Sequence, residues 1–140
     1  PAISILHAGE NGALARIIQM VADNSGNPIN SMYFWLTGLL SAFLDNAPTY
    51  LVFFNIAGTS APENIGIANY LMHNIPDTLV AISLGAVFMG AMSYIGNAPN
   101  FMVKSIAEEN NISMPSFFGY FLWSLIILIP VFIIITIIMF

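Results

Sequence analysis

The sequence has no cysteine and almost no basic residues. Its 140 residues include two Lys or Arg side chains (Arg16 and Lys104), seven Asp or Glu and two His. The lack of cysteine excludes disulfides, thiolate metal sites and a cysteine nucleophile. Two basic side chains cannot neutralise a phosphate backbone, which excludes nucleic acid as a partner.

Charge of either sign is also scarce. Charged residues make up 6% of the chain and hydrophobic residues 58%. A soluble chain has about 25% charged residues and about 45–50% hydrophobic residues. The mean hydropathy is +0.83. So little charge cannot cover a water-facing surface. We therefore expect an integral membrane protein, of a bacterial inner membrane, with the lipid bilayer as its first partner.

A signal peptide is also missing from the sequence. Pro1 opens the chain in place of an initiator methionine, and no basic stretch precedes a short apolar core. We interpret the chain as an excised piece of a longer polytopic protein.

The clearest apolar segment is the last one, over residues 115–140. Ser116–Phe140 contains no charged residue. A helix of this length measures about 37 Å at about 1.5 Å per residue, enough to cross a hydrocarbon core of about 30 Å. Pro130 is expected to kink this helix, which membrane helices tolerate. The segment predicts a spanning helix.

The rest of the chain divides into shorter segments, and the expected fold is an all-α integral membrane protein. Ser31–Leu44 is apolar but too short to span, as in a re-entrant segment. Asp77 is expected to cap the helix that follows it. The predicted segments are an interfacial segment over 1–30 (with a short amphipathic helix at Ala13–Ala22 and a turn at Asp23–Pro28), a re-entrant hairpin over 31–58, a loop over 59–76 and a broken helix over 77–110.

One motif occurs twice. Asn46-Ala47-Pro48-Thr49-Tyr50 returns as Asn97-Ala98-Pro99-Asn100-Phe101, each time between two short apolar helices. Proline lacks an amide hydrogen and disfavours helical geometry in the residue before it. Each motif therefore predicts a break in a helix. Carbonyl groups freed in hydrocarbon persist when they are buried in protein, line a wet cavity or bind a cation.

Oxygen-rich breaks of this kind suit a hard cation such as sodium in a secondary transporter. The candidate ion- or substrate-binding residues are Asp45, Asn46, Thr49, Asn97 and Asn100, with Ser41 and Ser93 one turn before the breaks. Of these, Asp45, Asn46, Thr49 and Asn97 are the candidate sodium ligands. The two helix N-termini that restart after the breaks favour an anionic group. No cofactor other than the sodium ion is expected.

Simpler interpretations remain open at this point. One alternative interprets both prolines as structural kinks and Asp45 as a helix cap. Residues 31–57 then form either one kinked span or a surface hairpin. No nucleophile–base pair or metal-ligand cluster is present, so we expect no enzyme activity.

The two motifs and their flanks resemble a known family. Leu40–Tyr50 and Ser93–Phe101 are similar to the paired signatures of the ion transporter superfamily, and within it to the citrate transporter and sodium:proton antiporter group of the arsenite-permease and NhaD-like type. The resemblance implies the C-terminal half of an inverted-repeat carrier. It implies a re-entrant hairpin with its tip at Asp45–Thr49 and a discontinuous helix unwound near Ile95–Asn100, which meet around sodium and substrate.

The same resemblance assigns roles to single residues. Asn46 and Thr49 match polar positions of the hairpin tip, and Asn97 and Asn100 match those of the unwound segment. Relatives that carry dicarboxylates have a Ser-Asn-Thr tip, whereas this chain has Asp-Asn-Ala-Pro-Thr. The extra acid favours sodium/proton antiport, with Asp45 as the exchanger.

Two alternatives to antiport remain. One is a sodium-coupled citrate or dicarboxylate transporter, and the other, from a different class, is a non-transporting membrane anchor or subunit. The expected partners are the N-terminal half of the same transporter and a small ion or carboxylate substrate. A homodimer is an open alternative.

Overall fold

The structure is a computed structural model that describes residues 13–140, with side chains from residue 16 onward. Two parallel helices in direct contact form its centre. These are α3 (Asn30–Ser41) and α6 (Pro76–Met89). A Cβ atom on Gly85 would overlap the Phe34 carbonyl oxygen, and one on Gly38 would overlap the Met89 side chain. Glycine therefore lets the two helices approach closely, as in packed membrane helices.

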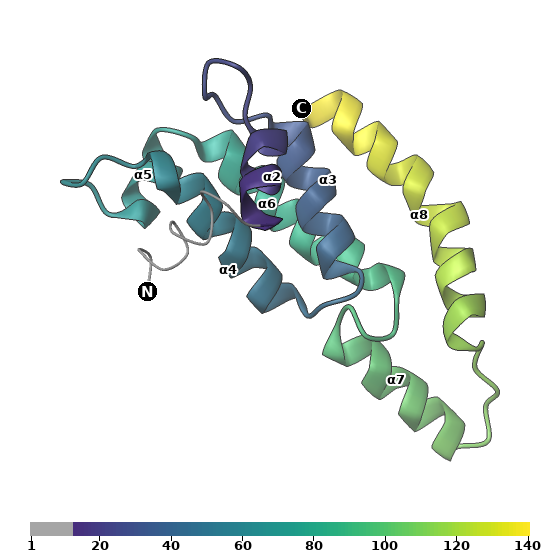
Figure 1. Cartoon of the computed structure of the whole chain (residues 1–140). Helices are drawn as coiled ribbons and strands as arrows, with labels where there is room; N and C mark the ends of the chain where they lie inside the picture. The colour runs from purple at the N-terminus through teal and green to yellow at the C-terminus, as the bar shows by residue number, and fades with distance from the viewer. Residues whose placement is uncertain (1–12) are drawn as a thin grey trace.

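Helix α4 (Asn46–Ala57) runs back along α6 and completes a helical hairpin with α3. Figure 1 shows the tip of this hairpin near the end of α6. Phe34, Phe53 and Ile82 are fully buried where the three helices meet. A hairpin over 31–58 is thus present, with its turn at residues 42–45.

The predicted loop over 59–76 is wrong in part, because it contains helices. A 3-10 turn, η1 (Gly58–Ser60), follows α4, and α5 (Ile67–His73) precedes α6. The cap of α6 also differs from the prediction. The helix begins at Pro76 with Ile75 in the cap position, so Asp77 lies in its first turn. Proline is favoured there because a first-turn N–H has no helical partner.

The described part of the N-terminal segment contains the predicted short helix and turn. Helix α2 (Ala13–Val21) packs through Ile17, Ile18 and the buried Val21, while Arg16 is exposed. In the turn that follows, the Asp23 carboxylate accepts hydrogen bonds from the N–H groups of Ser25 and Asn27, both at 2.8 Å. Residues 1–12 of the predicted interfacial segment lie outside the described residues.

The predicted broken helix is observed. After α6 comes a 3-10 turn, η2 (Gly90–Met92), then irregular chain over 93–97, and then α7 (Ala98–Glu109). Figure 1 shows α7 leaving the bundle beyond this break. No residue of α7 is buried, so its position depends on contacts at the break.

Helix α8 (Phe117–Met139) occupies the segment that is predicted to span the membrane. Its most apolar window has a mean hydropathy of 3.0, and only 11% of that window is buried against the rest of the described chain. Figure 1 shows it curving along the outside of the bundle. Within residues 13–140 it alone is long and apolar enough to cross a membrane as one helix; α5 taken with Pro76–Met92 meets the same criterion as a pair bent by 102°.

Candidate functional site

The two Asn-Ala-Pro motifs begin helices in the structure. Pro48 lies in the first turn of α4, and Pro99 lies in the first turn of α7. The prediction that each proline itself interrupts a helix is therefore wrong, since a first-turn proline removes no helical hydrogen bond. The unwound chain comes before each motif, at residues 42–45 and 90–97.

The Asn46 side chain bridges the hairpin tip and the break. One end of its amide faces three oxygens, at 2.8 Å from Ser41 Oγ and 2.9 Å from the carbonyls of Ala86 and Gly96. All three accept at this point, so the amide directs its NH₂ group at them. The three acceptors belong to α3, α6 and the unwound segment. Asn46 thereby joins both motifs in one junction.

Two glycines make room for this junction. A Cβ on Gly90 would overlap the Asn46 side chain, and one on Gly96 would lie 2.7 Å from the carbonyl oxygens of Gly90 and Ser41 and 3.0 Å from that of Ala42. Real Cβ atoms do not approach oxygen so closely. Backbone oxygens of the hairpin tip and of the break are therefore packed around Gly96.

The two serines cap freed carbonyls across the junction. Ser41 Oγ donates to the Ala86 carbonyl at 2.6 Å, and Ser93 Oγ donates to the Ala42 carbonyl at 2.6 Å. Both side chains are fully buried. Ser93 Oγ also accepts from the N–H groups of Ile95 and Gly96, at 3.2 and 2.9 Å. The hydroxyls replace helical bonds that the unwound chain has lost.

The two asparagines of the second motif differ in their contacts. Asn100 Nδ2 donates to the Ser93 carbonyl at 3.1 Å and lies 3.5 Å from the Gly90 carbonyl. Asn97 occupies the cap position of α7 in extended geometry, without a capping hydrogen bond from its side chain. It is partly exposed. Asn100 thus stabilises the break, whereas the Asn97 amide remains available to a ligand.

Asp45 lies at the exposed edge of the tip. Its carboxylate accepts from the Asn46 N–H at 2.8 Å and so caps α4. This is the geometry of the helix-cap interpretation. The cap occupies one carboxylate oxygen and leaves the second free of this contact.

Two buried hydroxyls have no hydrogen-bond partner within the described residues. Thr49 Oγ1 lies on the first turn of α4, and Thr37 Oγ1 lies on α3. Leaving such a group unsatisfied costs about 1–3 kcal/mol. Thr49 belongs to the predicted set. Thr37 was missed because it lies outside both motifs, in a segment that reads as apolar helix.

The chemistry available at this junction is that of neutral oxygen. Over residues 13–140, no three His, Asp or Glu side chains come together as a metal site. Carbonyl, amide and hydroxyl oxygens instead surround the tip and the break, with one carboxylate beside them. Hard cations prefer such oxygens.

The outer side of the junction is open. Ala47 and Pro48 are exposed at the start of α4, and Ala98 and Pro99 are exposed at the start of α7. Both helices have twelve residues, and the positive ends of their dipoles meet at the junction. An anion that approaches this side faces two helix N-termini.

Sequence reasoning missed the glycines and two tyrosines of this region. Gly90 is one of several glycines in an apolar helix, and only its contact with Asn46 reveals its role. Tyr94 and Tyr120 are stacked beside the break, with ring centroids 4.3 Å apart. Tyr120 lies near the start of the apolar helix α8, where the sequence gives no sign of a contact with the break.

The structure combines an apolar outer helix with a hairpin and a broken helix that meet through buried polar groups, an arrangement typical of membrane transporters. The whole chain, residues 1–140, matches the family described as putative citrate transport. The chain belongs to this family, which is consistent with membership of the ion transporter superfamily. No curated protein and no solved structure matches it.

Proposed function

We propose that the chain is part of a sodium-coupled secondary transporter that carries citrate or a related carboxylate. The observation that supports this proposal most strongly is the Asn46 bridge, which holds the hairpin tip against the unwound segment. Broken helices that meet in this way form the substrate and ion sites of many secondary transporters.

The sodium ion would bind on the oxygen-rich side of the junction. The carbonyl of Ser41 lies where α3 ends, and the hydroxyl of Thr49 has no partner among the described residues. Most other freed carbonyls carry one side-chain hydrogen bond each and keep a second lone pair. Asn97 and the free oxygen of Asp45 would complete the set from the exposed edge.

The carboxylate substrate would bind on the open side, against the N-termini of α4 and α7. The first-turn prolines leave few N–H groups there, so the helix dipoles and the Asn97 amide would contribute most of the attraction. Asp45 lies at the same tip and repels an anion. A sodium ion between Asp45 and the substrate removes this repulsion, so substrate should bind only after sodium.

Sodium/proton antiport is the second candidate, and Asp45 is the residue that favours it. It is the one acidic residue of the two motifs and their turns. In this mechanism Asp45 would bind a proton and a sodium ion alternately. No carboxylate substrate would then be needed.

One flux experiment separates the two candidates. Full-length protein in vesicles receives a sodium gradient while internal pH and labelled citrate are followed, with wild type beside Asp45→Asn. Citrate transport predicts uptake that requires sodium in wild type and depends less on sodium in Asp45→Asn, because the repulsion is gone. Antiport predicts proton movement without citrate, abolished in Asp45→Asn.

A non-transporting anchor predicts neither signal, and that result would overturn both candidates. Glu63→Gln, in the chain between η1 and α5, is the matched control because it removes one carboxylate far from the tip in sequence. We also propose that the protein lies in the lipid bilayer and that an N-terminal half of the same transporter contributes the rest of the site. Its role in this proposal is transport and not catalysis.

A further inference from the structure

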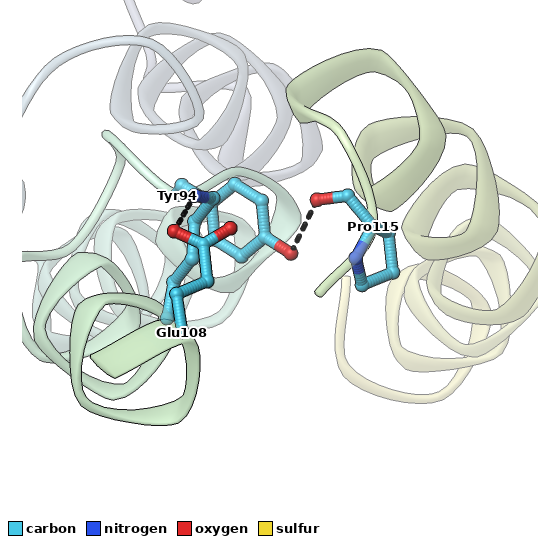
Figure 2. A network of polar contacts seen from close by, with 4 residues as sticks. Tyr94, Glu108 and Pro115 are labelled. Carbon is cyan, nitrogen blue, oxygen red and sulfur yellow. Dashed lines mark hydrogen bonds and ion pairs between the residues drawn. The ribbon is translucent and has the colours of Figure 1, made fainter. Parts of the chain in front are cut away.

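Two stacked tyrosines connect the break to the start of α8. The Tyr94 hydroxyl donates to the Pro115 carbonyl at 3.1 Å, as Figure 2 shows, and the Tyr120 hydroxyl donates to the Ala91 carbonyl at 2.9 Å. Their rings lie at an angle of 25°. Each tyrosine thus reaches from its own segment to the backbone of the other. We call this arrangement the tyrosine brace.

The bond from Tyr120 replaces a lost helical bond. In a continuous helix the Ala91 carbonyl would accept from the Ile95 N–H. Here the Ile95 N–H points to Ser93 Oγ at 3.2 Å instead. The Tyr120 hydroxyl therefore supplies the donor that the unwound chain no longer provides. Without it, an uncapped carbonyl would favour rewinding the segment or drawing in water.

Helix α7 is held to the same brace by its lysine. Lys104 Nζ lies 5.6 Å from the centroid of the Tyr94 ring and 2.6 Å from the Glu108 carboxylate. Figure 2 shows Glu108 beside the ring of Tyr94. A lysine over an aromatic face is attracted to it. The Tyr94 side chain, which belongs to the break itself, therefore contacts α7 after the break and the start of α8.

We propose that Tyr94 and Tyr120 are positioning residues that hold the segment 90–97 in the unwound form required by the cation site. The inference rests on the proposed function, because it assigns the brace to that site. Neither tyrosine touches the ion. They act through Ala91 and through the path of the chain to Gly96, whose carbonyl accepts from Asn46 at 2.9 Å.

Removal of the hydroxyls alone tests the brace. Tyr120→Phe and Tyr94→Phe keep the stacked rings and lose one hydrogen bond each. We expect the sodium concentration for half-maximal transport by the full-length protein to rise several-fold in each variant, with the maximal rate nearly unchanged. Tyr70→Phe, on α5 near the base of the hairpin, is the control and should behave as wild type. Unchanged sodium dependence in both brace variants would overturn the proposal.

A second measurement does not depend on transport. Met92 is buried in η2, where the residue is 5% exposed, and the sequence has no cysteine of its own. In a cysteine-free full-length protein, a Met92→Cys reporter should react slowly with a membrane-permeant maleimide. Adding Tyr120→Phe should accelerate the reaction several-fold, whereas adding Tyr70→Phe should not.

The transport and labelling measurements distinguish a failure of the proposed function from a failure of the tyrosine brace. If wild type shows no sodium dependence while Tyr120→Phe accelerates labelling, the proposed function is wrong and the brace stands as a structural element without a role in sodium binding. If labelling is unchanged in Tyr120→Phe, the brace is wrong even where transport is sodium-coupled.

Discussion

The junction of the hairpin tip with the break differs from helix α8 in which side chains are buried and which are exposed. At the junction, the fully buried Ser41 and Ser93 donate to carbonyls of other segments. Along α8, apolar side chains such as Ile126 and Ile134 are 60% and 55% exposed. Polar groups are therefore inside and apolar groups outside.

This difference in buried and exposed side chains indicates what each region contacts. Exposed isoleucine is stable in lipid and unfavourable in water. Buried serine and asparagine are costly unless they are hydrogen-bonded, and a membrane protein keeps them inside where a function requires them. The exposed apolar surface of α8 is thus suited to contact with lipid, and the junction is the region where we propose that a solute binds.

The largest expected effect tests a place where α8 behaves like the interior. Phe132 is 2% exposed and packs edge-on against Phe34, with ring centroids 6.2 Å apart. Phe132→Ala should lower the free energy of unfolding by about 3–5 kcal/mol, measured by denaturant titration in detergent. Ile133→Ala, next to it but 46% exposed, should cost far less. Equal losses would mean that α8 is packed evenly on both sides.

The next effect tests how tightly the junction is packed. Gly96→Ala places a methyl group against the carbonyls of Gly90 and Ser41. Overpacking of this kind costs about 1–3 kcal/mol, and about 1.4 kcal/mol corresponds to a tenfold change. We expect sodium-driven uptake to fall by about tenfold or more. Gly66→Ala, where a Cβ meets nothing within 4 Å, is the control, and a loss of equal size in Gly66→Ala would contradict this explanation.

A smaller effect concerns the polar contact that ties α8 to α3. Trp35 Nε1 donates to Thr136 Oγ1 at 3.0 Å. Thr136→Val keeps the shape and removes the acceptor, and should cost about 0.5–1.5 kcal/mol. In a double-mutant cycle with Trp35→Phe, the two losses should be less than additive. Fully additive losses would show that the two side chains do not interact.

The smallest effect is at the turn after α2, outside the candidate membrane spans. Hydrogen bonds from Asn27, through its backbone and its side chain, lower the pKa of Asp23 below 3.8. The folded protein thus favours the charged carboxylate, so its contribution is complete above the unfolded pKa. It is lost as pH falls through the folded pKa. Asp23→Asn should therefore reduce the acid sensitivity of unfolding slightly, and an unchanged pH profile would contradict this.

Sequence alone predicted much of the fold and the location of the site. Long apolar runs defined α8, and the repeated motif placed both breaks within a few residues. It could not show that Pro48 begins a helix, because proline both ends helices and favours their first turn. Helix α5 was missed because it is short, and it lies in a polar stretch.

The partners of the site residues were also out of reach of the sequence. The amide of Asn46 meets Gly96, fifty positions away, and such contacts depend on how the hairpin folds onto α6. The role of Asp45 as a cap was one of two open interpretations, and the structure shows that geometry. Its part in ion exchange remains a prediction.

The most direct test of the central claim is equilibrium binding of labelled sodium to the purified full-length protein. Wild type is compared with Asn46→Ala, which removes the bridge, and with Asn55→Ala, which removes an amide that donates within α4 to the Leu51 carbonyl. We predict saturable binding in wild type and Asn55→Ala, and a loss of about tenfold or more in affinity in Asn46→Ala, as expected when a buried bridging group is removed. Equal sodium affinity in all three proteins would contradict the claim that the junction binds the ion.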